Sequence, residues 1–283
     1  MIFGMLALTA ELVSRSSTYE VHEPMHRPSS ARLVWNEDFS GAKLKQSEWS
    51  FETSHNKQGW FNGERQYYSA DRPENLRLSK GILTIDARAE KLDPARYPDW
   101  GGQAYTSARI ISTRAWRYGF YEVKAKLPCA RGTWPAIWLL PKGMTKWPDD
   151  GEIDIMEQVG SEPNIIYTTL HSGAFNHVKG TQRGAHRVVP TSCNAYHRYQ
   201  LDWRPNSILI GVDDRAILRV DRKPADGKPE WPFDRPFQMI LNLAIGGSWA
   251  GAKGIDDAAM PQRMDIDYVR VWQSGPATSK TAR

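Results

Sequence analysis

Several features that would indicate a membrane, metal or nucleic-acid-binding protein are missing from this sequence of 283 residues. No stretch reaches the roughly 18 apolar residues that a membrane-spanning helix needs. The two cysteines, Cys129 and Cys193, form no CxxC pair, which argues against a thiolate zinc site. One disulfide is compatible with an oxidising compartment, but the sequence does not show whether the two residues are close enough to pair. Basic residues outnumber acidic ones by 37 to 32 and are scattered, so no nucleic-acid-binding stripe is expected.

Long helical patterns and internal linkers are also lacking. A helical turn is expected only within residues 256–260, and no repeat divides the chain. Residues 1–30 carry Pro, Ser and His without a period, and residues 274–283 are small and polar. Both ends are therefore expected to be flexible flanks of one domain that spans residues 31–273. The apolar run 2–10 has no basic residue before it, so a remnant signal peptide and a simple N-terminal extension both remain open.

Short runs rich in Val, Ile, Tyr, Trp and Thr recur instead between turn residues. In residues 121–127 apolar and polar side chains alternate, which is typical of a half-buried antiparallel strand. Further runs of this kind are LRLSKGILTIDA, IIYTTLHS, YHRYQLDW, SILIGVDD, QMILNLAIGG and IDYVRVWQ. The pattern predicts an all-β sandwich of two stacked antiparallel sheets. Many of the 12 tryptophans stand beside Gly or Pro; they suit either a core or a cleft that stacks on flat, weakly polar ligands.

Residues 22–26, HEPMH, match the HExxH pattern of zinc proteases. That chemistry requires a helix that brings both histidines onto one face. Pro24 lies inside the turn and Pro28 follows closely. Because an interior proline costs a helix about 3 kcal/mol or more, no zinc site is expected here.

Residues 150–158, DGEIDIMEQ, carry three acids with an irregular spacing. On a β-strand, Glu152 and Asp154 point to the same face, whereas Glu157, three residues beyond Asp154, points to the other. The apolar residues among them indicate a central strand with one face in the core, and stability alone does not favour clustered acids on the opposite face. A β-bulge at the Ile-Met pair would return Glu157 to the acidic face, and bulges are frequent beside active sites.

With this bulge the acids have the arrangement of a catalytic site. Two Glu side chains that lean across a concave sheet would bring their carboxyl groups to roughly 5–6 Å, as in retaining glycosidases. One carboxylate then attacks the sugar while the other carboxyl protonates the leaving oxygen. Asp154, between them, can hold a shared proton and keep one Glu ionised while the other stays protonated. An acidic strand face that is merely exposed to solvent would not explain why Glu157 departs from the two-residue spacing of Glu152 and Asp154.

The stretch GEIDIMEQVG resembles the signature of glycoside hydrolase family 16, in the bulged form of laminarinase-like endo-β-1,3-glucanases. The resemblance continues in the family's order through VWNEDFSG, NGERQYYS, YTSARIIST, YGFYEVKAKLP, GTWPAIWLLP, TTLHSG, NLAIGGSWAG and MDIDYVRVW, and so covers about residues 31–273. It implies a β-jelly-roll whose concave face forms an open cleft for a glucan chain. By position it implies that Glu152 is the nucleophile, Asp154 the assisting acid and Glu157 the general acid/base.

The resemblance also implies a set of substrate-binding residues. His171 matches the family's histidine near the catalytic strand, although alone it would be an ordinary strand histidine. Trp134 is expected in the cleft and Trp138 in either the cleft or the core. Trp249 lies in a Gly-rich loop, where sugar stacking is favoured over burial. Arg109 binds sugar hydroxyls or forms a structural ion pair. The full set is Asn62, Arg109, Trp134, Trp138, His171, Asn242 and Trp249.

Members of this family often carry a structural calcium ion on the convex face. The matching positions are Asp38, Gly81 and Asp267, with Gly81 contributing its carbonyl oxygen, and oxygen ligands suit this hard cation. No cofactor is expected for catalysis. The expected partner is a β-glucan polysaccharide bound by a monomer, with neither nucleic acid nor membrane involved. Because a polymer cannot enter a cell, a secreted or periplasmic location is expected.

The activity implied is endo-acting, retaining hydrolysis of β-1,3-glucan. The same scaffold also hosts mixed-linkage β-1,3-1,4-glucanases, agar-type galactanases and transglycosylases, since a fold does not fix a substrate. The motifs GTWPAIW and GGSWAG favour β-1,3-glucan over galactans. A β-glucan-binding protein without catalysis is an alternative of another class. It would need the tryptophan cleft but not Glu152 and Glu157, so the presence of both acids favours an enzyme.

Overall fold

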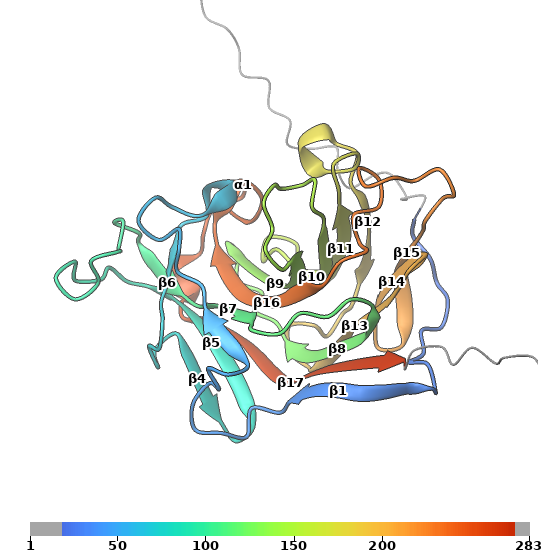
Figure 1. The fold of residues 1–283 in the computed structure, drawn as a ribbon. Coiled ribbons are helices and arrows are strands. Elements are labelled where there is room, and N and C mark those ends of the chain that lie inside the picture. Colours follow the sequence, from blue (N-terminus) through green and yellow to red (C-terminus); the bar gives the residue numbers. More distant parts are fainter. Residues whose placement is uncertain (1–18, 275–283) are drawn as a thin grey trace, which may run out of the picture.

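Two stacked β-sheets make up most of the structure, a computed structural model in which residues 19–274 are described (Figure 1). The first sheet has ten strands in the order β15-β14-β13-β8-β17-β5-β6-β3, with β1 beside β17 and β4 beside β5. Its strands are β1 (Ala31–Glu37), β3 (Gln66–Tyr68), β4 (Leu76–Ser79), β5 (Ile82–Ala89), β6 (Tyr105–Ser107), β8 (Gly119–Lys126), β13 (His197–Arg204), β14 (Ser207–Val212), β15 (Arg215–Asp221) and β17 (Gln262–Ser274).

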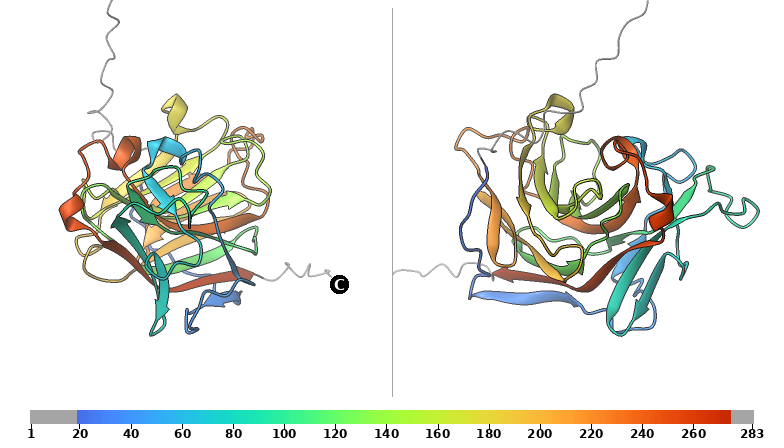
Figure 2. Two further views of the ribbon diagram at one scale, coloured as in Figure 1. Left: turned by 90° about the vertical axis from the view of Figure 1, so that its left-hand side faces the viewer. Right: turned by 180° about the vertical axis from the view of Figure 1, so that it is seen from behind.

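The second sheet has seven strands in the order β12-β11-β10-β9-β16-β7-β2 and curves like a shallow bowl (Figures 1 and 2). Its strands are β2 (Trp49–Phe51), β7 (Arg109–Ser112), β9 (Thr133–Pro141), β10 (Glu152–Glu157), β11 (Ile165–His171), β12 (Arg183–Val188) and β16 (Phe237–Ile245). The short helices are η1 (Phe61–Gly63), η2 (His177–Lys179), α1 (Gly247–Ala250) and η3 (Asp257–Ala259). The last of these confirms the helical turn expected within residues 256–260.

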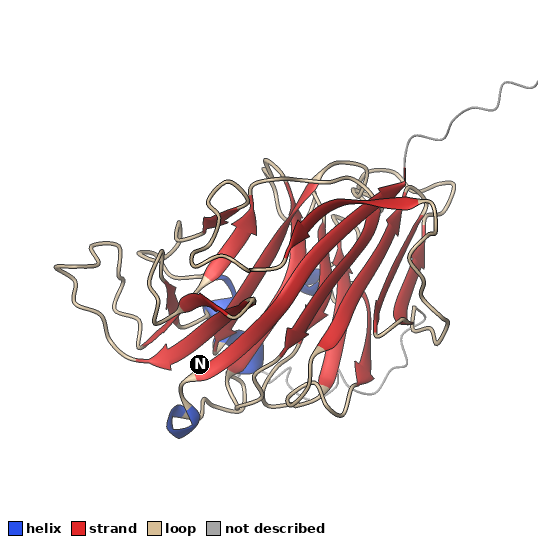
Figure 3. Ribbon diagram, turned by 90° about the horizontal axis from the view of Figure 1, so that it is seen from below, coloured by secondary structure: helices blue, strands red, loops and turns tan. Residues whose placement is uncertain are grey.

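The strand pairing confirms the predicted sandwich. Neighbouring strands pair antiparallel throughout the described sheets except for β3 and β6, which are parallel. The long strands of the ten-stranded sheet lie side by side when the molecule is seen from below (Figure 3). Between the sheets, side chains such as Val123, Leu201, Leu139 and Met239 are completely buried. Along β9 the burial alternates between the core and the open face of the bowl, as the period-2 pattern requires.

The N-terminal boundary of the domain differs from the sequence expectation. Residues 19–30 belong to the predicted flexible flank, yet residues 19–25 form three backbone hydrogen bonds with β15 and a fourth with Asp214 just before it; one of them joins Val21 N–H to Ile217 O at 2.9 Å. Met25 is only 1% exposed and packs beside Phe120. The flank folds because it supplies both backbone partners for an open strand edge and an apolar side chain to bury. The apolar run 2–10 lies outside the described residues.

The two cysteines are joined in a disulfide, with their Cα atoms 5.7 Å apart. The bond links the loop after β8 to the loop between β12 and β13, which the sequence alone could not decide. The HEPMH segment is not helical, as its prolines led us to expect, and Glu23 forms an ion pair with Arg219. Among the described residues, no helix has the length and apolar character required to span a bilayer.

Candidate active site

The strand β10 carries the three acids, and its register contains the predicted bulge. Asp154 and Met156, two residues apart, pair with adjacent residues of β9, and the register against β11 shifts at the same place. Ile155 and Met156 are both completely buried, so two consecutive side chains enter the core. This extra inward residue returns Glu157 to the face that carries Glu152 and Asp154.

Each glutamate has its own indole donor. The Nε1–H of Trp147 donates a hydrogen bond to Oε2 of Glu152. The Nε1–H of Trp134, on β9, donates to Oε1 of Glu157 at 3.0 Å. A donor aimed at a carboxylate favours its ionised form and fixes the side-chain rotamer. The two carboxyl groups are therefore held separately, from opposite ends of the bulged strand.

Asp154 lies between the two glutamates and is 3% exposed. The Nε2 atom of His171 lies 3.4 Å from Oδ2 of Asp154, and β11 places His171 directly opposite Glu152. Within residues 19–274, Nδ1 of His171 is buried without a hydrogen-bond partner. The structure thus brings His171 into the carboxyl cluster, where the resemblance to the family had placed it.

Burial raises the pKa values of all three carboxyl groups, and repulsion by neighbouring acids adds to this rise for Glu152 and Glu157, whereas a hydrogen bond with Glu152 opposes it for Asp154. Burial, followed by the charge of Asp154, raises the pKa of Glu152 to about 8, against the opposing effects of His171 and of the Trp147 hydrogen bond. Burial likewise raises the pKa of Asp154 to about 8. The pKa of Glu157 lies well above its usual value because both neighbouring acids add to its burial. Ionisation of either neighbouring acid therefore favours the protonated form of Glu157, which is the form that a general acid requires.

The strand β9 presents both of its tryptophans to the open face of the bowl. Trp134 and Trp138 are half-buried, whereas the intervening Ile137 is completely buried. The Nε1–H of Trp138 donates to Oδ1 of Asn242 at 2.7 Å, and the Asn242 amide donates to the hydroxyl of Tyr68 at 3.1 Å. Trp138, which pairs with Asp154 across the strands, therefore lies on the face of the sheet that carries the acids and not in the core.

Arg109 forms the structural ion pair that was one of the two roles considered from the sequence, and its contact with sugar hydroxyls stays a prediction. Its Nε–H donates to Glu52 Oε2 at 2.7 Å, so it forms an ion pair. Its guanidinium also lies 5.0 Å from the ring centroid of Trp60 and 4.7 Å from that of Trp138. The ion pair and the two rings hold the guanidinium flat beside the indole of Trp138, on the substrate side of the sheet.

Trp249 and Asn62 lie on two short helices, α1 and η1, that contact each other. The ring centroid of Trp249 lies 5.3 Å from that of Trp134 and 4.9 Å from that of Tyr167. Asn62 lies in η1 with φ of 58°. Gly247, the first residue of α1, approaches η1 closely. A Cβ atom at this position would lie 3.1 Å from the Asn62 carbonyl oxygen and 3.4 Å from Trp134 Cζ3. Gly247 has a φ of 78°, and its backbone approaches these atoms closely, so this position requires glycine.

Several residues of the site were not predicted from the sequence. Trp147 contacts Glu152, and its ring centroid lies 5.9 Å from that of His171 and 4.9 Å from that of His177. Tyr68 orients Asn242 through its hydroxyl. The signal for Trp147 was its place beside a proline just before the acidic motif, whereas His177 and Tyr68 carried no local signal.

The expected calcium ligands lie on the ten-stranded sheet, away from the acids. A Cβ atom at Gly81 would be 3.6 Å from the Asp38 carbonyl, so these two positions are neighbours. Their oxygens suit calcium, but the ammonium of Lys124 already contacts Oδ2 of Asp267 at 2.7 Å and competes with a cation there. Calcium binding stays a prediction. In the described part of the chain, the one cluster of His, Cys, Asp and Glu side chains close enough to share a metal ion is Glu152, Asp154 and His171.

Comparison with known proteins agrees with this architecture. Residues 47–270 match glycosyl hydrolases family 16. The β-glucanase of Rhodothermus marinus is 42% identical over 252 residues, which cover 85% of each chain. The glucan endo-1,3-β-glucosidase of Cryptopygus antarcticus is 35% identical over 252 residues, covering 85% of this chain and 91% of that one. The crystal structure of SCLam, a non-specific endo-β-1,3(4)-glucanase, has a TM-score of 0.88 at 44% identity and covers 92% of this chain and 97% of its own. With its bulged acidic strand, jelly-roll fold and these relatives, the chain belongs to glycosyl hydrolases family 16 and is a glycoside hydrolase.

Proposed function

We propose that this enzyme hydrolyses internal β-1,3 linkages of β-glucan with retention of the anomeric configuration. The single observation that supports it most is the bulged strand β10, which sets Glu152, Asp154 and Glu157 on one face. Of these three acids, Glu152 and Glu157 accept indole hydrogen bonds, from two different tryptophans. Two distinct carboxyl environments are what a double displacement needs.

In the first step, the Glu152 carboxylate attacks the anomeric carbon while Glu157 gives its proton to the departing glycosidic oxygen. Burial and the charge of Asp154 raise the pKa of Glu152, whereas the charge of His171 and the Trp147 hydrogen bond oppose this rise and so favour the attacking carboxylate. In the second step, Glu157 takes a proton from water, and that water displaces Glu152 from the sugar. Asp154 lies between the two glutamates, so it can hold a proton in one step and release it in the other.

The cleft around the acids supports a flat, hydroxylated chain as the substrate. Trp134, Trp138 and Trp249 offer apolar ring surface, and Arg109 and Asn242 offer donors beside them. Tryptophan faces and hydrogen-bonding side chains together suit pyranose rings.

The test is to follow the first-formed anomer by NMR during cleavage of laminarin. A β-anomer at early times supports retention, and also the carboxyl separation of roughly 5–6 Å expected from the sequence. An initial α-anomer refutes the mechanism. Glu152→Gln and Glu157→Gln should each lose nearly all activity while remaining folded, and azide should partly restore cleavage only for Glu157→Gln, because a small anion can complete the second step.

A second candidate is cleavage of mixed-linkage β-1,3-1,4-glucan by the same site. It is favoured by the similarity to SCLam, which is a non-specific endo-β-1,3(4)-glucanase. A product profile across laminarin, lichenan, agarose and carboxymethyl cellulose separates the two. Cleavage of laminarin alone supports strict β-1,3 specificity, and comparable rates on lichenan support the broader one.

Export from the cell is proposed on two grounds. The polymeric substrate lies outside the cell, and the Cys129–Cys193 disulfide suits an oxidising compartment. Cell fractionation followed by thiol alkylation tests it. Recovery of the protein in the cytoplasm with two free thiols would contradict the proposal.

A further inference from the structure

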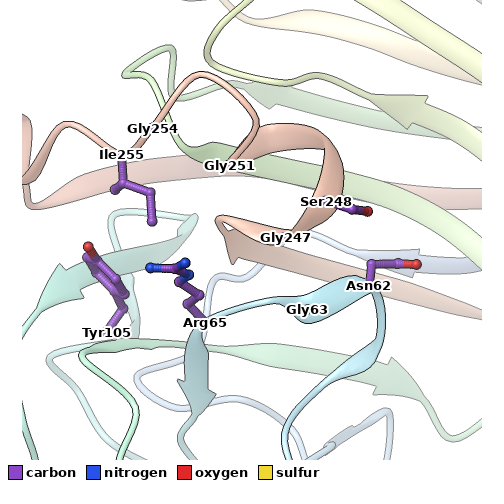
Figure 4. A pocket seen from close by; sticks show the side chains of 9 residues that line it. All are labelled: Asn62, Gly63, Arg65, Tyr105, Gly247, Ser248, Gly251, Gly254 and Ile255. Atoms are coloured by element: carbon purple, nitrogen blue, oxygen red, sulfur yellow. The ribbon is translucent and has the colours of Figure 1, made fainter. Parts of the chain in front are cut away.

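Beside the catalytic cleft lies a cavity of about 490 Å³ that none of the three acids lines. It opens between η1, α1 and the loop after α1 (Figure 4). Its volume falls within the range of about 300–1,000 Å³ that small-molecule sites occupy. The residues around it are Asn62, Gly63, Arg65, Tyr105, Gly247, Ser248, Gly251, Gly254 and Ile255.

The cavity is continuous with the wall of the cleft. Gly247 and Asn62 belong to its lining, and a Cβ atom at Gly247 would touch Trp134 at 3.4 Å. Trp134 in turn donates the hydrogen bond to Glu157. Ser248 precedes Trp249, whose ring packs on Trp134. A glucan chain that stacks on these two tryptophans therefore passes the mouth of the cavity.

The guanidinium of Arg65 is the main donor in the cavity. Its side-chain stem is confined, because a Cβ atom at Gly246 would lie 3.2 Å from Arg65 Cγ and 3.2 Å from Ile255 Cδ1. The head group extends between Tyr105 and Ile255 (Figure 4). Within residues 19–274, this guanidinium has no hydrogen-bond or ion-pair partner. Its five N–H donors are available to a ligand.

The balance of charge and polarity favours an uncharged, hydroxylated ligand. The hydroxyl of Tyr105 donates to Asp257 at 2.6 Å, so the edge of the cavity at Tyr105 carries a carboxylate as well as a phenol. Ile255 adds an apolar surface, and Ser248 and Asn62 add a hydroxyl and an amide at the mouth. An arginine donor beside an aliphatic face matches the polar edge and apolar face of a pyranose ring.

The depression also continues beyond Arg65. A second cavity of about 390 Å³ shares Arg65 and Tyr105 with the first and is bordered by residues 57–59 and 101–104. The guanidinium thus stands between two hollows, each of a size that suits a sugar. A ligand that enters from the cleft can place one unit against Arg65 and still continue outward.

We propose that this cavity binds a hexosyl unit that branches from the glucan chain held in the catalytic cleft. In a β-1,3-linked backbone, O1 and O3 of each sugar are used by the chain, and the exocyclic O6 extends farthest from it. A glucosyl branch on O6 therefore leaves the cleft sideways, where the mouth of the cavity lies. This inference rests on the proposed β-glucan substrate, and it makes Arg65 a determinant of specificity for branched chains.

The experiment compares kcat/KM on a linear β-1,3-gluco-oligosaccharide and on the same oligosaccharide with a β-1,6-glucosyl branch. Arg65→Ala removes the donor, and Ser248→Phe fills the mouth. Each variant should lose about tenfold on the branched substrate, as expected for a hydrogen bond to a charged group. Each should stay within about twofold on the linear one. Arg114→Ala, which removes an exposed arginine that pairs with Glu48, is the matched control and should change neither rate.

Longer linear oligosaccharides show whether the unit is a branch or a distant backbone sugar. A loss confined to long linear chains would overturn the branch assignment in favour of a backbone unit. Equal losses on all substrates, or no loss on the branched one, would overturn the proposal that the cavity binds a hexosyl unit. Cleavage of linear laminarin by the unaltered enzyme reports on the proposed function separately. Saturation-transfer NMR with gentiobiose, which lacks a β-1,3 bond, gives a reading independent of catalysis: binding that Arg65→Ala abolishes supports the pocket, and its absence in the unaltered enzyme contradicts it.

Discussion

Shortening Met156 and deleting it should have opposite effects on stability and catalysis. Met156 is completely buried and contributes to the core beneath the bulge. Met156→Ala keeps the length of β10 and leaves a cavity, which costs about 2–5 kcal/mol of the free energy of unfolding. Because the register of Glu157 against β9 is unchanged, the folded fraction should retain most of its activity.

Deleting Met156 leaves the sequence Glu-Ile-Asp-Ile-Glu, in which the acids alternate on one face without a bulge. The strand loses its local twist, and the carboxyl group of Glu157 shifts by about an ångström relative to Glu152 and to the Trp134 indole. A misplacement of this size costs on the order of 100-fold in rate. The deletion variant should therefore fold but cleave slowly.

Urea unfolding followed by tryptophan fluorescence gives the stability of both variants, and initial rates on laminarin give kcat and KM. Rates are compared at a temperature where each variant is fully folded. The unaltered protein measured at the same temperature is the control. If Met156→Ala abolishes cleavage in a folded protein while the deletion remains fully active, the account of the bulge is refuted.

Three further perturbations follow from the contacts of the site. Trp134→Phe removes a hydrogen bond that lowers the pKa of Glu157, so that pKa should rise and the alkaline limb of the kcat/KM profile should move to higher pH; an acidward shift would contradict the assignment. Burial raises the pKa of Glu152 to about 8, so the folded state binds the extra proton and the free energy of unfolding should fall as pH rises from about 5 to 8. Glu152→Gln should flatten that slope in urea titrations, and an unchanged slope would argue against it. Replacing Cys129 and Cys193 by Ala removes a crosslink between residues 64 positions apart and should lower the free energy of unfolding in urea by about 2–4 kcal/mol. No change would show that the bond does not stabilise the fold.

The sandwich and the bulge were predictable because both follow from periodicity. Alternation identifies strands, and one extra residue among three acids identifies a bulge, so Ile155 and Met156 could be assigned to the core in advance. Family motifs then placed His171 and Trp249 near the acids. None of this required knowledge of which strands are neighbours.

Contacts between distant segments were not predictable in the same way. Asn242 and Tyr68 are 174 residues apart, and Tyr105 and Asp257 are 152 apart, so their hydrogen bonds depend on the order of strands in the sheets. The choice for Trp138 between core and cleft likewise depended on its neighbour Asn242, which comes from β16. Pairing of the cysteines depended on two loops that only the fold brings together.

The segment 19–25 has a practical consequence for anyone who shortens this protein. The family match begins at residue 47 and the sequence pattern at residue 31, and a chain cut at either point would lose this segment. Its removal would uncover the backbone donors and acceptors of β15 together with the apolar site of Met25, and Arg187 would lose its bond to the Val21 carbonyl. An uncovered strand edge is a template for pairing between molecules. Self-association of such a shortened enzyme would therefore be a product of the cut and would say nothing about its native assembly.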